Sequence, residues 1–174
     1  VRFGEATAIE VKNIDYENKR LEIHGTLDMR HGGFKNAVKT TPKTIASYRE
    51  VSLTNREIEI LKEMQKIKEL DQHLRQNFHE SDFIFVSKNG IPISNAFFNT
   101  TLKNANSRLD NPINKRISSH IFRHTLISRL AENNIPLRAI MDKVGHSDPK
   151  TTNAIYTHAT ENMNDNLMAV LEKY

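Results

Sequence analysis

One tyrosine in the last quarter of the chain stands among residue types that could do chemistry. Tyr156 lies in the polar stretch "GHSDPKTTNAIYTHAT", residues 145–160, and is one of four tyrosines in the sequence. A phenol with a pKa of about 10 is a poor nucleophile at neutral pH. Cationic neighbours would stabilise both its phenolate and the pentacoordinate phosphorane formed by attack on a phosphodiester. Tyr156 is therefore either a half-buried packing residue or a nucleophile.

Cationic side chains of the required kind precede it. In "HIFRH", residues 120–124, His120 and Arg123 are three positions apart and share one face of a helix. Arginine suits phosphate because its planar fork donates two parallel hydrogen bonds and keeps its charge. A histidine beside it can bond a phosphate oxygen or move a proton near neutral pH. His146 is a second such imidazole. The alternative for this stretch is an ordinary capped helix start.

A zinc site is a further alternative, because His120 and His124 are four positions apart. The zincin motif requires glutamate where this chain has Ile121. The sequence also has no cysteine, no clustered carboxylates for two metals and no glycine-rich nucleotide loop. We therefore predict no metal and no cofactor, and a phosphoryl transfer that relies on protein cations and a phosphotyrosine intermediate.

Composition sets the class of protein. The 174 residues are 37% hydrophobic, enough for one well-cored domain. The net charge of +4 suits a polyanionic partner without requiring one. No run of 18 apolar residues and no signal segment occurs, so we expect a soluble protein with no membrane partner.

The pattern predicts a mainly α fold with a small antiparallel β-sheet (α+β). Residues 3–11 carry helix formers, and residues 20–54 read as extended segments around Gly32-Gly33. "TNRE" at 54–57 is a capping box for a long helix. Residues 82–90 predict a strand and an Asn-Gly turn. The apolar face of the long helix is expected to contain Ile60, Leu61, Met64, Ile67 and Leu70.

Four more helices should position the candidate residues. Ser94 caps the first, and Ser118 or Ser119 caps the one that carries "HIFRH". A short helix from Pro136 ends at Gly145, and Asp148-Pro149 starts the helix that carries Tyr156. A last helical stretch places four apolar residues on one face: Met163, Leu167, Val170 and Leu171.

Five stretches, in this order and spacing, resemble the tyrosine recombinases of the phage-integrase family. They are "VRFGEATAIEVKNID", similar to the family's first arginine box, "TPKTIASYREVSL", similar to its lysine hairpin, and then "HIFRHT", "VGHSDPKTT" and "AIYTHA". Each stretch alone is a weak signal, but the ordered set is specific. The resemblance covers residues 1–160, which we expect to form a tyrosine recombinase catalytic domain that is truncated at its N-terminus.

The resemblance implies a role for each matching residue. Tyr156 would attack a DNA phosphodiester and leave a 3′-phosphotyrosyl link and a free 5′-hydroxyl. Arg2, Arg123 and His146 would bind the scissile phosphate, and His120 would assist proton transfer. Lys43 would protonate the leaving 5′-oxygen, with Lys35 and Lys39 as nearby alternatives. Glu5 is expected to orient its helix or an arginine, and His124 to be structural.

The resemblance also implies partners. These are double-stranded DNA at attachment or core sites, a homo-tetramer on that DNA, and DNA-bending or directionality factors. Residues 161–174 would form a tail helix that packs on its own domain or docks on a neighbouring protomer. We expect a site-specific recombinase in a bacterial cytoplasm, with three alternatives: a type IB topoisomerase, a non-catalytic DNA-binding relative and a metal-dependent nuclease.

Overall fold

The computed structural model describes residues 1–28, 33–40, 48–145 and 149–172. For Phe34, Pro149 and residues 162–170 it describes the backbone alone. Contacts divide the chain into two compact units. The N-terminal unit contains residues 2–119, and the C-terminal unit contains Val1 with residues 120–174.

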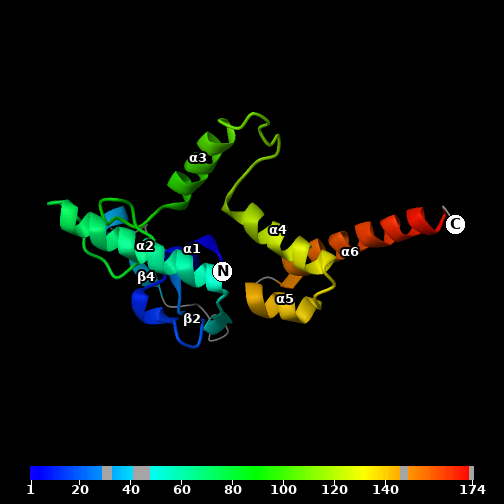
Figure 1. The fold of residues 1–174 in the computed structure, drawn as a ribbon, viewed down its shortest axis with the longest axis horizontal. Coiled ribbons are helices and arrows are strands. Elements are labelled where there is room, and N and C mark those ends of the chain that lie inside the picture. Colours follow the sequence, from blue (N-terminus) through cyan, green and yellow to red (C-terminus); the bar gives the residue numbers. More distant parts are fainter. Residues whose placement is uncertain (29–32, 41–47, 146–148, 173–174) are drawn as a thin grey trace. The chain divides into compact units, whose positions relative to one another are not determined.

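The described elements confirm a mainly α fold with small antiparallel sheets (Figure 1). The helices are α1 (Phe3–Thr7), α2 (Asn55–Leu74), α3 (Asn95–Asn106), α4 (Ser119–Glu132), α5 (Leu137–Val144) and α6 (Pro149–Leu171). Two short 3-10 helices are η1 (Val11–Asn13) and η2 (Phe34–Asn36). The strands are β1 (Ile14–Asp15), β2 (Arg20–Ile23), β3 (Thr26–Asp28), β4 (Val38–Thr40) and β5 (Arg49–Ser52).

The strands form two sheets. One is three-stranded in the order β1-β2-β5, and the other pairs β3 with β4. Alternation decides which side is buried: Leu21 and Ile23 face the core, while the residues beside them in β2 are exposed. Leu21 lies opposite Val51 and Ile23 opposite Arg49 in the antiparallel register. The extended segments expected between residues 20 and 54 are confirmed at β2, β3, β4 and β5, which lie in two sheets rather than one. Residues 34–36 form η2 instead, and residues 29–32 and 41–47 lie outside the described residues.

The first turns of α2 cover this sheet. Thr54 Oγ1 accepts from the Glu57 N–H at 3.2 Å, and Glu57 Oε2 accepts from the Thr54 N–H at 2.7 Å, which confirms the capping box. Ile58 and Leu61 are buried in the core, and Met64 packs against it. The rest of the predicted apolar face is wrong. Ile60 lies about 200° round the helix from the buried Ile58, and Ile67 and Leu70 lie beyond Met64, the last α2 residue that packs against the core cluster. Ile60, Ile67 and Leu70 are 39%, 45% and 59% exposed.

The predicted strand at residues 82–90 does not form. Phe83 makes an isolated bridge to Glu10, and Val86 makes another to Pro92. The segment forms single bridges to two different parts of the chain, so no continuous ladder of hydrogen bonds develops. The predicted turn is present: Gly90 has φ 78°, and a Cβ there would lie 2.0 Å from the His79 carbonyl oxygen, so only glycine fits.

In the C-terminal unit, α4, α5 and α6 meet around a second buried cluster (Figure 1). Ile127 comes from α4, Ile140 and Val144 from α5, and Ala159 from α6. Burial of each large aliphatic side chain contributes about 1.5–3 kcal/mol. The predicted start of α5 after Pro136 and its end at Gly145, with φ 93°, are confirmed. The predicted boundary at residue 160 lies inside α6.

Among the described residues, none of the helices combines the length and apolar character that crossing a membrane requires.

Candidate active site

Four of the six predicted site residues are described. Arg2 belongs to the N-terminal unit, and His120, Arg123 and Tyr156 belong to the C-terminal unit. Lys43 and His146 lie outside the described residues. Each unit therefore contributes its own part of the predicted site, and the convergence of the two parts remains a prediction.

Arg2 is held at the start of α1 by Glu5. The Arg2 backbone N–H donates to Glu5 Oε2 at 2.7 Å, and Arg2 Nη1 donates to Glu5 Oε1 at 3.4 Å. The Arg2 side chain is 29% exposed, whereas the Glu5 side chain is 7% exposed. The expectation that Glu5 orients an arginine therefore agrees with the contacts. The carboxylate lies inside the protein, and the guanidinium reaches toward its surface.

A second arginine binds the same carboxylate. Arg49, the first residue of β5, donates from Nη1 to Glu5 Oε1 at 3.0 Å and from Nη2 to Glu5 Oε2 at 2.8 Å. Burial raises the pKa of Glu5 and is the largest single influence on it. The bonds from Arg49 and from the Arg2 backbone, with the charges of both guanidiniums, outweigh burial and hold that pKa below its usual range. The contact joins residues 44 positions apart, which no local pattern reveals.

Lys39, one of the alternatives to Lys43, is engaged elsewhere. Its ammonium donates to Glu10 Oε2 at 3.0 Å and to Asn13 Oδ1 at 2.9 Å. Burial raises the pKa of Glu10. Hydrogen bonds and charges from Lys39 and Lys12 lower it by more, so the pKa lies below its usual range. Lys39 thus links β4 to η1, which is a structural role. Lys43 therefore stays the preferred candidate for the proton donor to the leaving oxygen.

The lowered pKa values of Glu5 and Glu10 predict how the stability of the fold changes in acid. Because their pKa values are lower in the folded chain than in the unfolded one, their stabilisation is present above the unfolded pKa of about 4.3 and is lost as pH falls through the folded value. We expect the stability difference between the parent protein and Glu5→Gln to shrink between pH 6 and pH 3. Urea unfolding at each pH measures it. Glu59→Gln, in an exposed pair with Arg56, is the control. A difference that is constant with pH contradicts the argument.

Arg123 is fixed at the C-terminal end of α5. Its side chain is half-buried, Nη1 donates to the Val144 carbonyl, and Nη2 donates to the Gly145 carbonyl at 3.3 Å. These carbonyls belong to the last turn of α5, where helix carbonyls lack intrahelical partners and the helix dipole is negative. Two bonds from one planar group set the orientation of the guanidinium.

The two histidines of α4 are both exposed. His120 precedes Arg123 by three residues, close to one helical turn, and His124 follows Arg123 directly. His120 and Arg123 therefore lie on the same face, as the spacing predicts. His124 is expected to be structural, either packed or hydrogen-bonded next to Arg123, and its exposure shows that it is not packed. Among the described residues, no group of three or more His, Cys, Asp or Glu is arranged to hold a metal ion.

Tyr156 is both packed and reachable. It is half-buried on α6 and packs against the cluster that contains Val144, the residue whose carbonyl binds Arg123. Thr152 and Ala159, on either side of it in sequence, are 2% and 6% exposed. The ring thus faces the α4–α5–α6 core. Arg123 and Tyr156 are tied to the same three helices.

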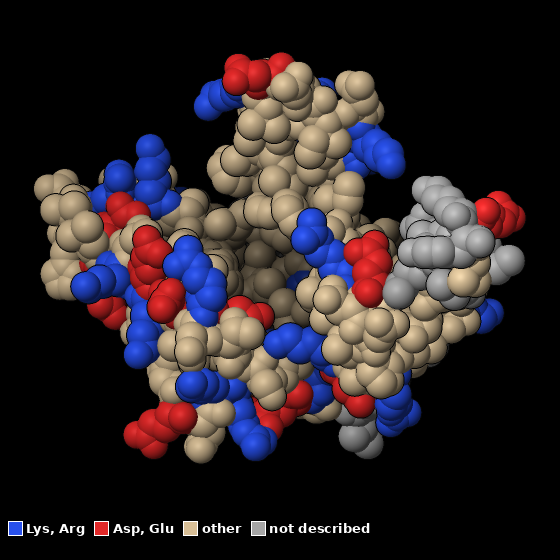
Figure 2. All heavy atoms as spheres, turned by 45° about the vertical axis from the view of Figure 1, so that its right-hand side comes forward, with Lys and Arg blue, Asp and Glu red and all other residues tan. Residues whose placement is uncertain are grey.

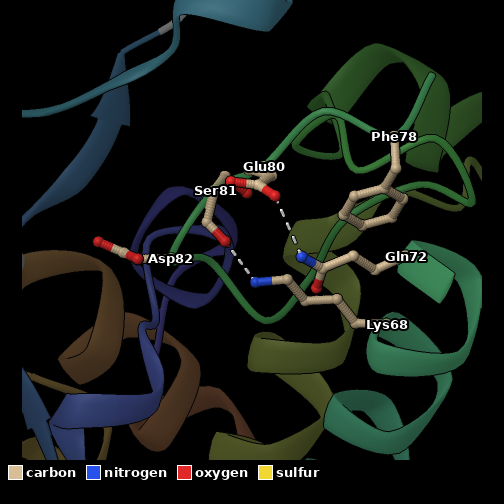
Figure 3. Close-up of a pocket in the computed structure, with 6 residues that line it drawn as sticks. All are labelled: Lys68, Gln72, Phe78, Glu80, Ser81 and Asp82. Atoms are coloured by element: carbon tan, nitrogen blue, oxygen red, sulfur yellow. Dashed lines mark hydrogen bonds between the residues drawn. The ribbon is translucent and has the colours of Figure 1, made fainter. Parts of the chain in front are cut away.

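A surface pocket beside α2 is separate from these residues. A pocket of about 440 Å³ is lined by residues of α2 and of the 78–82 segment (Figure 3). Lys68 donates there to the Ser81 carbonyl and to the Phe83 carbonyl at 2.9 Å. Burial lowers the pKa of Lys68. The lining includes none of the four predicted site residues that the structure describes, and Lys68 serves to fasten this segment to α2.

Positive charge is concentrated in α3 and the segment that follows it. Figure 2 shows Lys and Arg interspersed with Asp and Glu over this face of the molecule, and the uppermost lobe carries blue side chains on both sides. Residues 99–117 contain four cations and one carboxylate, so they account for +3 of the net +4. Lys103, Lys115 and Arg116 line a groove together with the amides of Asn99, Asn106 and Asn114. This groove was not predicted from the sequence, although the excess of cations in residues 99–117 was a signal for an anion-binding surface.

Comparison with known proteins identifies relatives along the whole chain. The sequence profile of the "Phage integrase family" matches residues 1–163. The "Prophage ps2 probable integrase" of Lactococcus lactis is 53% identical over 99% of this chain and 45% of its own length. The integrase of Staphylococcus phage L54a is 39% identical over 99% of this chain and 48% of its own length. The chain thus spans about half the length of the curated relatives it matches.

Solved structures share the fold. A structure of the Tn1549 transposon integrase in complex with circular intermediate DNA matches with a TM-score of 0.73 at 22% identity, over 98% of this chain and 56% of that chain. The crystal structure of XerA recombinase matches with a TM-score of 0.64 at 20% identity, over 95% of this chain and 53% of that chain. At these identities the likeness establishes the fold.

Proposed function

The chain belongs to the phage integrase family, and from this premise we propose that it is the catalytic domain of a site-specific DNA recombinase. The activity is breakage and rejoining of DNA through a tyrosyl intermediate. One observation carries the proposal: Tyr156 packs against the same three-helix cluster whose Val144 carbonyl binds Arg123. A nucleophile of the required kind and a phosphate-binding cation are thereby held by one small core.

The proposed reaction uses protein groups alone. The Tyr156 phenolic oxygen forms a bond to phosphorus, its proton passes with the help of His120, and the bond from phosphorus to the 5′-oxygen breaks. Lys43 gives a proton to the leaving 5′-oxygen. Arg2, Arg123 and His146 bind the phosphate and stabilise its developing charge. Ligation is the reverse, with the 5′-hydroxyl of another strand attacking the phosphotyrosyl link.

The proposal includes partners. We expect double-stranded DNA containing the attachment site, a homo-tetramer that joins two duplexes, and accessory DNA-bending or directionality factors. The relatives come from a bacterium and a phage, which supports action in the cytoplasm of a bacterial host. The helical segment after residue 160 continues α6 and is the proposed contact between protomers.

The matches favour recombination over the alternatives. The relatives and structures described above are integrases and recombinases, which favours strand exchange over a type IB topoisomerase. The presence of all six candidate residues in sequence favours catalysis over a non-catalytic relative. The nuclease alternative requires a metal ion and is separated by experiment.

A nicked DNA substrate tests the proposal. Cleavage close to the nick releases a short strand with its 5′-hydroxyl, so religation is prevented and the covalent intermediate accumulates. We expect the full-length native protein to form a protein–DNA adduct in EDTA, seen as a band of higher mass on a denaturing gel. Cleavage that depends on Mg²⁺, or that leaves no protein on the DNA, would support the nuclease alternative.

The groove beside α3 gives a second test. If Lys115 and Arg116 contact DNA phosphates, replacing both by alanine should lower the slope of log K against log[salt] by about 2, since each contact contributes about 0.9. Fluorescence anisotropy over a salt series measures the slope. Arg56→Ala is the matched control, because this exposed cation of α2 is already paired with Glu59 at 3.2 Å. An unchanged slope in the double variant removes the groove from the DNA interface.

A further inference from the structure

We propose that Arg49 is a positioning residue for Arg2: it holds the Glu5 carboxylate in the orientation that presents Arg2 to a substrate phosphate. This inference rests on the proposed function, because it assigns Arg49 a part in the same phosphoryl transfer. Arg49 itself touches no reacting atom in this proposal. It acts through Glu5.

The contact between Arg49 and Glu5 is geometrically specific. Two guanidinium nitrogens meet the two carboxylate oxygens, at 3.0 Å and 2.8 Å. The Arg49 and Glu5 side chains are 13% and 7% exposed, so water screens the pair little. A bidentate pair fixes the plane of the carboxylate as well as its position. The antiparallel register of Arg49 with Ile23 fixes the other end of the contact in the sheet.

From Glu5 the contacts continue to Arg2. Oε2 accepts the Arg2 backbone N–H at 2.7 Å, and Oε1 accepts from Nη1 of the Arg2 side chain at 3.4 Å. The helix that follows Arg2 has only five residues, too few to hold its own first turn in water. The Glu5 carboxylate therefore holds the start of α1 in place, and Arg49 in turn holds the carboxylate.

The charges in this group also suit an anion. Two guanidiniums share one carboxylate, so the three side chains together carry a net charge of +1. Arg49 is the more buried of the two arginines, and Arg2 is the one that reaches toward the surface, at 29% exposed. Arg2 can then bind a phosphate without leaving Glu5 unpaired, because Arg49 still neutralises it. A lysine at position 49 keeps the charge but cannot match both oxygens in one plane.

The experiment measures single-turnover cleavage of the nicked substrate by the full-length native protein at saturating DNA. We expect Arg49→Lys to slow cleavage by about 10²-fold, the effect of a misplacement of about 1 Å. Affinity for DNA should change by less than about twofold, because many phosphate contacts contribute to it. A second variant, Arg49→Met with Glu5→Met, removes both buried charges and so leaves no unpaired partner. It should remain folded by thermal melting and still cleave slowly.

A methylphosphonate at the scissile position separates positioning from a general structural role. This neutral group has no anionic oxygen for Arg2 to neutralise, so the Arg49 variants should cleave it at rates close to the parent rate. The control is Lys68→Met, which removes a part-buried cation of the same unit that donates to the Ser81 and Phe83 carbonyls. Its cleavage of the ordinary phosphodiester should match that of the parent protein.

The outcomes distinguish the two proposals. Absence of a covalent adduct in the parent protein overturns the proposed function, and this inference with it. A parent adduct combined with parent-like cleavage by Arg49→Lys and by the Arg49/Glu5 double variant overturns the inference alone. Equal losses on phosphodiester and methylphosphonate, or an equal loss in the Lys68→Met control, also overturn it, because either would show a general structural effect.

Discussion

Replacing Tyr156 by phenylalanine is expected to abolish the covalent protein–DNA adduct. The substitution removes one oxygen and keeps the ring that packs against the α4–α5–α6 cluster. Fold and DNA affinity should therefore be unchanged. Loss of an enzyme's nucleophile costs on the order of 10⁶ in rate, so we expect no adduct within the detection range of a denaturing gel.

The matched control is Tyr16→Phe. Tyr16 packs against the core of the N-terminal unit, and its hydroxyl lies 3.3 Å from Gln65 Oε1. It has no place in the predicted site, so its variant should form the adduct at the parent rate. An adduct that persists in Tyr156→Phe would assign the nucleophile to another residue.

The second large effect is expected at Arg123. Arg123→Ala removes the cation that would stabilise the phosphorane, and we expect single-turnover cleavage to fall by about 10²–10³-fold, as when one such donor is lost. Arg123→Lys retains the charge but loses the planar fork, so it should recover only part of the rate. Quenched cleavage time courses on the nicked substrate measure both variants.

Stability must be followed in the same variants. Arg123 donates to the Val144 and Gly145 carbonyls, and leaving such acceptors without a partner costs about 1–3 kcal/mol. Thermal melts identify a temperature at which all variants are folded, and cleavage rates are compared at that temperature. Arg129→Ala, an exposed position on the same helix, should affect neither measurement. Parent-like cleavage by a folded Arg123→Ala would remove Arg123 from the site.

Local signals in the sequence predict helix ends well. Thr54 and Ser94 cap α2 and α3 through their own hydroxyls, and Gly145 ends α5 with a positive φ. Each of these features depends on a few adjacent residues, because the unpaired groups at a helix end are satisfied nearby. For the same reason the ranges of α4 and α5 follow closely from the pattern.

Features that depend on tertiary contact were not predictable in the same way. The apolar face of α2 extends beyond the core that could cover it, so Ile67 and Leu70 stay exposed. Residues 82–90 have the composition of a strand, but in the part of the chain that the structure describes they make only isolated bridges and no ladder. The Arg49–Glu5 pair spans 44 residues, and composition alone does not select it from the many possible ion pairs. The resemblance to a family therefore supplies the six predicted site residues, whereas the structure supplies the contacts that hold Arg2, Arg123 and Tyr156.

The packing of α6 has a consequence for the position of Tyr156, the proposed nucleophile. Thr152 and Ala159 are small, buried, and placed four residues before and three after Tyr156, on the same face of the helix. Ala159 belongs to the cluster that α6 shares with α4 and α5, so its small side chain allows a close approach of the helices there. The half-buried phenol of Tyr156 lies on the same face as these two small side chains. A slip of one residue would turn the phenol by about 100° and shift it by about 1.5 Å. We therefore expect buried Thr152 and Ala159 to fix the register in which α6 presents the proposed nucleophile.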